Sequence, residues 1–436
     1  MSAWLRHLFL AVAGLAMLAL DLAGLRFLEA DAIPWFIATA LAQGAIYFVA
    51  VLWVVSRRPS PLGLIVFFAV LLRLPPLFAP PELSTDIYRY VWDGRVQAAG
   101  INPYRYVPDA SELKSLRDEE IHPNINRGDY AVTIYPPAAQ LFFLATTRVS
   151  ESVTWMKASI VACEGLAIWF LLLLLRRAGR PDAELLLYAW HPLAIWEFAG
   201  SGHVDAVAIA CILAAFLART KGRTGLAGAA LGLGALFKLY PLVLFPALWR
   251  PRDFRMPAAL AATIALGYLP YIGVGAGVLG FLPTYIREEG LQSGSRYYLL
   301  QLAEKLSGAD LHPAVYLVPV GLTLAALSVW VLLRRRSEDD LVGGGLLLAT
   351  AAVLALSPHY PWYFAWLLPL ATLASCTPVL LLGVSSFVLY WFLVEESAST
   401  ALYTGSLMFL PFAFFLIFRA SRTVRAAEGA HVDGAR

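Results

Sequence analysis

The sequence predicts an all-α membrane protein, a polytopic transmembrane helical bundle of about 12–14 spans with interfacial helices in one long outer loop. Of its 436 residues, 59% are hydrophobic and only 14% are charged, and the mean hydropathy is +0.67. One water-soluble core cannot bury that much apolar surface. The apolar residues also occur in long runs, many of them close to the ~20 residues that cross a bilayer as a helix.

These runs define the expected spans. The first run begins after MSAWLRH and lacks a small-residue cleavage site, so we expect a retained span and no removable signal peptide. The run 239–249 is too short to cross a bilayer unaided. The expected spans are 8–28, 34–55, 61–80, 153–175, 184–200, 203–218, 224–238, 239–249, 257–280, 312–333, 341–357, 360–375, 378–394 and 401–418.

Clusters of Lys and Arg predict the orientation of the spans, because short cytoplasmic loops are enriched in these residues. With the N-terminus inside, every cluster falls on the cytoplasmic side, and 224–249 must then form a hairpin. We therefore expect a single membrane domain over 1–436 with both termini in the cytoplasm. The clusters are Arg57 with Arg58, Arg176 to Arg180, Arg219 to Arg223, Arg250 to Arg255, Arg334 to Arg336, and the tail from Arg419.

Charge and cysteine content exclude several other classes of protein. The net charge of +3 is too small and too scattered to indicate a nucleic-acid partner. Cys163, Cys211 and Cys376 all lie in apolar runs without a CxxC pattern, so neither a disulfide framework nor a metal site is predicted.

The segment 81–152 is predicted to be an outer loop with helices of its own. Ser84 or Thr85 can cap the first helix, and Gly100 with Pro103 ends it. An apolar stripe and an opposite charged face predict that this helix lies flat at the membrane interface. The stripe holds Ile87, Val91, Gly94 and Ala98, and the charged face holds Asp86, Tyr90, Asp93 and Gln97.

A second helix is predicted within the same loop. The stretch YPPAAQLFFLATTRV, from Tyr135, is apolar over about 13 residues, which is too short to span a bilayer. We expect an interfacial or re-entrant helix with Pro136 or Pro137 in its first turn.

Polar groups that are typical of group transfer gather on the predicted outer side. Carboxylates beside a hydroxyl can act as a general base, cations can hold a phosphate, and aromatic faces suit sugars and headgroups. This mixture indicates transfer from a phosphorylated lipid. The groups are Asp86, Asp93, His203, Asp205, Lys238, Arg296, His359 and several Tyr and Trp side chains.

Each of these residues also has a structural interpretation. Asp86 could be a favourable first-turn carboxylate, and Asp93 a solvated or salt-bridged residue. His203 with Asp205 could cap a span, and Lys238 could snorkel from an apolar helix. Intramembrane ionisable groups such as Glu197 are functional candidates by default. The convergence on one side of the membrane favours a site.

Five motifs in order resemble the GT-C superfamily of polytopic glycosyltransferases. The match is closest to bacterial polyprenyl-phosphate-mannose-dependent mannosyltransferases and glycosyltransferase family 87, and it runs over roughly residues 60 to 370. The motifs are STDIYRYVWDGRVQAAGINPYRY at 84–106, YPP at 135–137, GSGHVDA at 200–206, LFKLYPLVLFP at 236–246 and SPHYPWY at 357–363.

The resemblance implies an inverting transfer of a hexose, with mannose as the expected sugar, from a polyprenyl-phosphate donor to a lipid or glycan acceptor on the extracytoplasmic face of a bacterial inner membrane. Asp86 matches the first carboxylate of the family's D-x-D pattern, and Asp93 matches a later one. Tyr88 stands at the second position of D-x-D, which departs from the pattern. No metal is implied as a requirement, although some superfamily members bind a divalent cation.

The resemblance also implies roles for the remaining candidates. Asp86 would be the catalytic base of the outer catalytic loop, 81–152. The donor phosphate would be held by Lys238, Arg296, His203 and His359, and the substrate would be positioned by Asp93, Arg89, Tyr135, Asp205 and Tyr360.

Two other functions fit the same topology. A transporter or lipid flippase would place its ionisable residues near the bilayer midplane in repeated halves, whereas here they gather on one side without a visible repeat. A lipid-binding assembly component without activity would not need Asp86 and Lys238 to face one cavity.

Overall fold

Helices build the described chain. The computed structural model describes residues 3–57, 61–334, 337–395 and 397–433, and within these ranges it contains helices and no strand, which confirms the all-α prediction. The α-helices are α1 (Ala3–Glu29), α2 (Ile33–Arg57), α3 (Leu62–Leu71), α4 (Leu74–Phe78), α5 (Asp86–Ala98), α6 (Pro137–Thr147), α7 (Val153–Arg177), α8 (Leu186–Ala189), α9 (Pro192–Ala194), α10 (Asp205–Thr220), α11 (Thr224–Ala235), α12 (Phe245–Leu248), α13 (Arg255–Tyr268), α14 (Leu282–Glu288), α15 (Tyr298–Ser307), α16 (Ala314–Arg334), α17 (Glu338–Leu356), α18 (Leu367–Leu373), α19 (Thr377–Ser385) and α20 (Ala398–Asp433).

Six helices of the described ranges are long and apolar enough to cross a membrane. They are His7–Glu29, Ile33–Arg57, Val153–Arg177, Arg255–Glu288, Ala314–Arg334 and Ser399–Ile417. Further apolar helices are shorter: Leu62–Phe78, Thr224–Ala235, Asp340–Leu356 and Thr377–Leu393. The expected count of about 12–14 continuous spans therefore resolves into long helices and several short or broken ones.

Prolines explain two of the broken spans. The expected span 184–200 is divided at His191, which is extended (φ −66°, ψ 122°) before Pro192, and the chain resumes as α9 and the π-helix η4 (Ile195–Gly200). The expected span 360–375 starts as a short 3-10 helix at Pro361 and continues as α18. Proline disfavours a helical conformation in the residue before it and donates no backbone N–H, so neither span forms one continuous helix.

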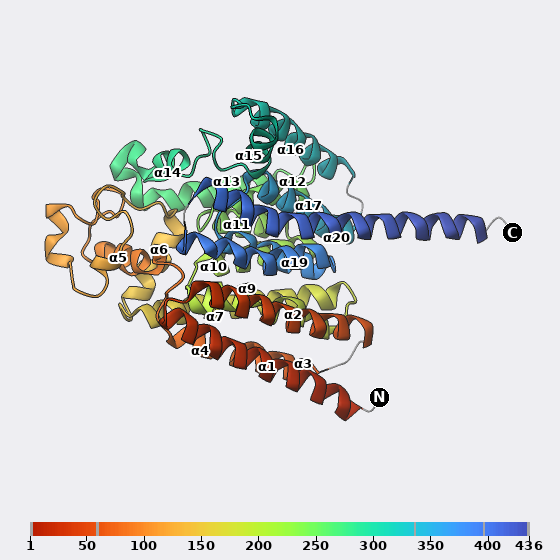
Figure 1. Cartoon of the computed structure of the whole chain (residues 1–436). Helices are drawn as coiled ribbons and strands as arrows, with labels where there is room; N and C mark the ends of the chain where they lie inside the picture. The colour runs from red at the N-terminus through yellow and green to blue at the C-terminus, as the bar shows by residue number, and fades with distance from the viewer. Residues whose placement is uncertain (1–2, 58–60, 335–336, 396, 434–436) are drawn as a thin grey trace.

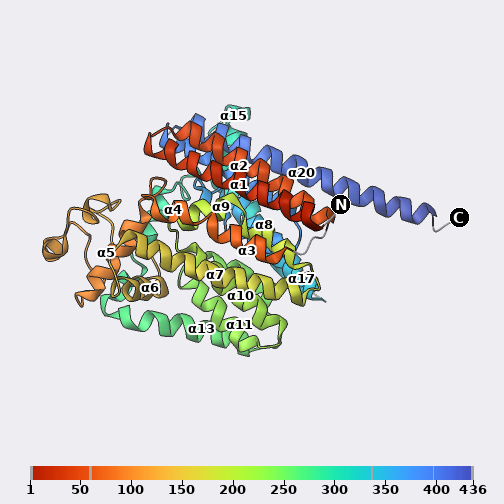
Figure 2. The ribbon, with the colours of Figure 1, turned by 90° about the horizontal axis from the view of Figure 1, so that it is seen from below.

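The long helices run between two ends of the molecule. In Figure 1 the start of α1 and the ends of α2 and α20 lie at one end, and α5, α6 and the segment between them lie at the other. Figure 2 shows the same separation from below. This is the arrangement that the charge pattern predicts for the termini and the outer loop. Of the basic clusters, Arg58, Arg335, Arg336 and Arg436 lie outside the described residues.

The chain folds back over 224–249, as the predicted hairpin requires. The Arg219 side chain at the end of α10 donates from Nε to the Leu248 carbonyl at the end of α12, over 2.8 Å. The Thr224 hydroxyl donates to the Asp253 carboxylate over 3.2 Å. Both ends of the segment therefore meet, and its turn, around Lys238, lies at the opposite end.

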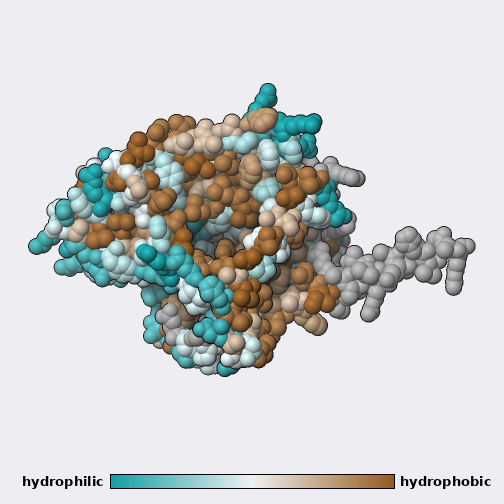
Figure 3. Space-filling view, turned by 90° about the horizontal axis from the view of Figure 1, so that it is seen from above, coloured by the Kyte–Doolittle hydropathy of each residue, from teal (hydrophilic) through white to brown (hydrophobic). Residues whose placement is uncertain are grey.

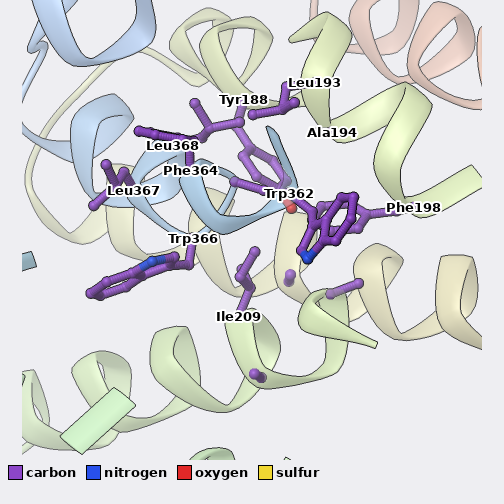
Figure 4. Packing of buried hydrophobic residues seen from close by; sticks show 14 of the residues in the cluster. Tyr188, Leu193, Ala194, Phe198, Ile209, Trp362, Phe364, Trp366, Leu367 and Leu368 are labelled. Carbon is purple, nitrogen blue, oxygen red and sulfur yellow. The ribbon is translucent and has the colours of Figure 1, made fainter. Parts of the chain in front are cut away.

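One buried apolar cluster joins the bundle from α1 to α20. At its centre the residues after Pro361 pack against the broken helices α8 to η4. Figure 4 shows Trp362 beside Phe198, while Trp366 lies on the other side of the same cluster. The rigid packing of these short pieces fixes the backbone immediately beneath the outer segment.

The helix predicted at 84–99 is present as α5, but the middle of its polar face is buried. Tyr90 and Asp93, on its expected charged face, are 0% and 1% exposed, and most of the apolar stripe is buried too. Gly94 allows α6 to approach, because a Cβ there would lie 2.5 Å from the Thr147 hydroxyl and 2.6 Å from the Phe143 carbonyl. Residues of α6 and of the 131–140 segment therefore cover much of the expected charged face, and the placement of α5 flat at the membrane interface stays a prediction.

The second predicted helix is α6, with Pro137 as its first residue. Its free N-terminal amides bind a carbonyl of the hairpin: the N–H groups of Ala138 and Ala139 donate to Leu236, over 3.1 and 3.2 Å. Orphan donors at a helix start need such partners. This contact brings Tyr135 and Lys238 to the same place.

Candidate active site

A cavity of about 640 Å³ lies between α5, the turn of the hairpin, and the 357–363 segment. Its polar part is formed by Asp86, Arg89, Asn126, Arg127, Lys238 and Glu289, and Tyr135, Tyr360, Trp362 and Tyr363 add aromatic faces. Its apolar part is formed by Leu239, Val243, Val278, Leu279, Phe281, Leu282, Ala352, Val353, Leu356, Phe392 and Leu393. Figure 3 shows a hollow on the face seen from above, bordered by hydrophobic and hydrophilic surface.

Asp86 is placed in the cavity wall by the start of α5. The Asp86 N–H donates to the Ser84 hydroxyl over 3.3 Å. The side-chain contact at the start of the helix is therefore made by Ser84, one residue before the N-cap residue Thr85. The carboxylate accepts from Asn126 Nδ2 over 3.2 Å and is 23% exposed. It therefore has lone pairs available to a substrate, beside the positive end of a helix dipole.

Lys238 faces the same cavity from the turn of the hairpin. Its Nζ lies 3.3 Å from Asp205 Oδ2 at the start of α10, and 5.4 Å from the centre of the Tyr135 ring. The Tyr363 ring centre is 5.9 Å from Nζ on another side. A lysine with a buried carboxylate behind it and aromatic faces around it is held at a fixed position, which suits recognition of an anion.

Asp93 belongs to a closed polar network behind the wall. It pairs with Arg89 Nε over 2.8 Å, and it accepts from Gln140 Nε2 over 2.8 Å and from the Thr133 hydroxyl. Arg89 also donates to the Ala131 carbonyl. Asp93 is therefore saturated with partners, while Arg89 itself still contributes to the cavity wall.

His203 lies behind Asp86. Its Nδ1 is 3.9 Å from Asp86 Oδ2, its Nε2 is 3.4 Å from Glu197 Oε2, and the ring is fully buried. It stacks on Trp362 at 4.2 Å between ring centres, and Trp362 stacks on Tyr360 at 4.6 Å. Trp362, which lines the cavity, thus separates it from His203, and His203 is not among the described lining residues.

Arg296 and His359 lie close together, but neither is among the described residues that line the cavity. Arg296 is ion-paired with Glu289 and donates from Nε to the Leu356 carbonyl over 3.2 Å, and its carbonyl lies 3.2 Å from His359 Nε2. Glu289 is the member of this group that reaches the wall. Of the four expected phosphate ligands, the structure brings Lys238 into the cavity.

Several wall residues were not predicted from the sequence. Asn126, which touches Asp86, and Arg127, which pairs with Glu288 over 3.0 Å, come from NINRGD, a stretch without any helical or strand period. Tyr285 shares a 2.9 Å hydrogen bond with Tyr363. The polar character of this stretch within an otherwise apolar chain is the signal that could have indicated them.

Burial keeps Tyr135 in its neutral form. Removal from solvent, together with the negative charge of Asp86, raises the pKa of Tyr135 well above its usual range. Its phenol therefore remains a hydrogen-bond donor beside Asp86 and Lys238.

Within the described residues, no group of three or more His, Cys, Asp or Glu is arranged to hold a metal ion.

Residues 7–250 match the family model described as alpha-(1->6)-mannopyranosyltransferase, N-terminal domain. The match covers more than half of the chain and includes Asp86, Tyr135, His203, Asp205 and Lys238. No curated protein and no solved structure gives a significant match.

Proposed function

Because the chain belongs to the alpha-(1->6)-mannopyranosyltransferase family, it is a membrane-bound mannosyltransferase, and we propose that it takes mannose from a polyprenyl phosphate on the extracytoplasmic face. The acceptor would be a lipid-linked or glycan hydroxyl. The family assignment agrees with the resemblance to GT-C mannosyltransferases that the motifs carry.

The observation that carries the proposed donor is the composition of the cavity. A carboxylate, a lysine and aromatic faces lie in the same space as a wall of aliphatic and phenyl side chains. A sugar on a lipid monophosphate has this same division, because its chain needs apolar surface and its phosphate needs cations. A nucleotide sugar would offer nothing to the apolar wall.

In the proposed reaction, Asp86 accepts the proton of the acceptor hydroxyl. The hydroxyl oxygen attacks the anomeric carbon from the face opposite the phosphate, and the bond from that carbon to the phosphate oxygen breaks, so the configuration inverts. Lys238 stabilises the charge that develops on the leaving phosphate, and Arg89 and Arg127 add positive charge to the wall. We place Tyr135 and Tyr360 against the sugar and polyprenyl phosphate.

The other predicted residues act indirectly in this proposal. Asp205 fixes Lys238, and Asp93 fixes Arg89, across the ion pairs described above. Arg296 and His359 would hold Glu289 and the 357–363 segment in place rather than touch the phosphate.

The alternatives lose support on different grounds. A lipid-binding component without activity would leave Asp86 and Lys238 unrelated, yet both line one cavity. A transporter or flippase is disfavoured by the family to which the chain belongs.

The donor is tested by supplying the purified full chain in liposomes with radiolabelled sugars on polyprenyl phosphate, one sugar at a time, together with GDP-mannose as a competing donor class. We expect label to move from the polyprenyl-phosphate mannose alone. Transfer from GDP-mannose in the absence of polyprenyl phosphate would overturn the proposed donor while leaving the mannosyltransferase assignment intact.

The proposed orientation has its own test. Reporters fused after Arg180 should report the cytoplasm, because this cluster is basic, and a reporter inserted near Pro108 should report the opposite side. A cytoplasmic signal at Pro108 would contradict an extracytoplasmic site.

A further inference from the structure

His203 bridges Asp86 to a second carboxylate that the proposed reaction does not use. Asp86 Oδ2 lies 3.9 Å from Nδ1, and Glu197 Oε2 lies 3.4 Å from Nε2. Asp86 is 23% exposed toward the cavity, whereas the side chains of His203 and Glu197 are fully buried. The three groups therefore form a line from the cavity into the protein.

The backbone holds this line rigidly. His203 follows Gly202, which has a left-handed conformation (φ +73°), and its N–H donates to the Glu197 carbonyl over 2.9 Å. A Cβ at Gly202 would lie 2.3 Å from Cδ1 of Ile87, so this turn packs directly on the residue after Asp86. The π-helix η4 and the start of α5 are thus fixed relative to each other.

Glu197 is oriented from its far side. Its Oε1 accepts from the Tyr390 hydroxyl over 2.6 Å, which leaves Oε2 facing the imidazole. When Glu197 is ionised, its Oε2 favours the imidazole tautomer with hydrogen on Nε2. The lone pair of Nδ1 then points toward Asp86, where it can accept a proton but offers none to the ionised carboxylate.

We propose that His203 and Glu197 are positioning residues that draw the acceptor proton away from Asp86 after transfer, an inference that rests on the proposed role of Asp86 as the base. When the acceptor oxygen bonds to the anomeric carbon and the electron pair of the broken bond leaves with the phosphate, the proton passes to Asp86. Protonated Asp86 can then donate to Nδ1, and the resulting imidazolium is balanced by Glu197. The proton returns through Asp86 to water when the cavity opens to product release.

The same geometry explains why His203 is not a phosphate ligand. Trp362 covers its ring on the cavity side, stacked at 4.2 Å. The charged groups around the imidazole are Asp86, Glu197, Asp205 and Lys238, and the last two compensate each other across 3.3 Å. The carboxylates oppose the cost of burying an imidazolium here, and Trp362 leaves the ring no path to a donor phosphate.

The test uses His203→Gln and Glu197→Gln in the full chain, assayed with mannosyl polyprenyl phosphate and a short mannoside acceptor. We expect His203→Gln to lower kcat by about 10²-fold, the low end of general acid–base effects. The donor KM should stay within about 2-fold of wild type, because the ring does not touch the donor. Glu197→Gln should act in the same direction, and the double variant should be no slower than His203→Gln alone.

The pH profile separates a proton role from a purely structural one. In the wild type, a proton taken up anywhere on the coupled Asp86 and His203 pair silences the base, so His203 adds a second position at which acid can inactivate the enzyme. His203→Gln should therefore move the acidic limb of kcat to lower pH. A packing defect would lower kcat without moving that limb.

His122→Gln is the matched control, since His122 pairs with Asp109 in the outer segment and is not among the described lining residues. His122→Gln should behave as wild type. Mannose transfer by the wild type and by this control tests the proposed function independently of the inference about His203. A raised donor KM in His203→Gln, or an unchanged kcat, would overturn the inference. If His203→Gln does not fold, Glu197→Gln decides: wild-type kcat with an unmoved acidic limb would equally overturn it.

Discussion

Asp86 and Asp93 lie two turns apart on the same face of α5, yet the protein treats them oppositely. Asp86 is 23% exposed in a cavity wall, with an amide hydrogen bond from Asn126 and an imidazole at 3.9 Å. Asp93 is 1% exposed and bound by Arg89, Gln140 and Thr133. Helical spacing makes the two carboxylates equivalent, and their surroundings distinguish them where spacing cannot.

The difference shows how the surroundings in a fold give two residues of the same type different roles. A carboxylate whose lone pairs are all occupied by fixed donors stabilises structure but cannot take a proton from a substrate without breaking that network. A carboxylate at a helix start that is bound by few fixed donors keeps lone pairs available to a substrate, near the positive end of the helix dipole. The availability of Asp86 therefore makes it the stronger candidate for the base.

Asp86→Asn is the most direct test of the difference between the two carboxylates. This change keeps the size of the side chain but removes its basicity, so we expect mannose transfer to fall by about 10² to 10⁴-fold. Donor binding and the midpoint of thermal unfolding in detergent should be retained. Turnover within a few-fold of wild type would reject Asp86 as the base.

The converse change is Asp93→Asn, which leaves the buried Arg89 without its counter-charge. Breaking one partner of a buried ion pair costs about 3–5 kcal/mol, so the free energy of unfolding should fall by an amount in that range. Turnover per folded molecule should remain measurable, because Asp93 is not among the described residues of the cavity wall. A stable Asp93→Asn protein without activity would instead move the base to Asp93.

Much of the fold could be predicted from the sequence, because long apolar runs indicate where the spans lie and basic clusters indicate which ends of the spans lie together. The hairpin at 224–249 followed from charge alone, and Arg219 and Leu248 do meet. The breaks at His191 and Pro361 were missed, although the prolines are visible, because hydropathy averages over a window and does not register one extended residue.

The site was predicted where a motif carried it and missed where tertiary contacts decide. Asp86 and Lys238, far apart in sequence, share one cavity as expected. The pairing of Arg296 with Glu289 could not be predicted, because the intervening chain has no regular period that would set their distance. Asn126 was missed for the same reason.

Gly94, the residue after Asp93, tests how tightly the helix that carries both carboxylates packs against α6. Gly94→Ala would place a Cβ 2.6 Å from the Phe143 carbonyl, which is backbone and cannot rotate away. We expect overpacking to lower the free energy of unfolding by about 1–3 kcal/mol and to reduce turnover as Asp86 shifts. Gly165→Ala is the control, because nothing lies within 4 Å of a Cβ there and alanine favours the helix. Equal stability of both variants would show that α5 and α6 adjust freely.

Asp118 supplies an intermediate case, a carboxylate that is paired like Asp93 but 35% exposed in the outer segment. Partial burial raises its pKa, but the Arg95 guanidinium and the N–H groups of His122 and Ile121 outweigh burial and lower the pKa to about 2. A carboxyl group whose pKa is lowered in the folded state stabilises the fold at pH values above its unfolded pKa of 3.8. This contribution is lost as the pH falls through about 2.

Because solvent screens an exposed pair, Asp118→Asn should cost only about 1 kcal/mol at pH 7. The gap between wild type and variant, measured as the midpoint of thermal unfolding, should be constant above pH 5 and close toward pH 2. A gap that does not change with pH would mean that Asp118 contributes through packing and not through its charge.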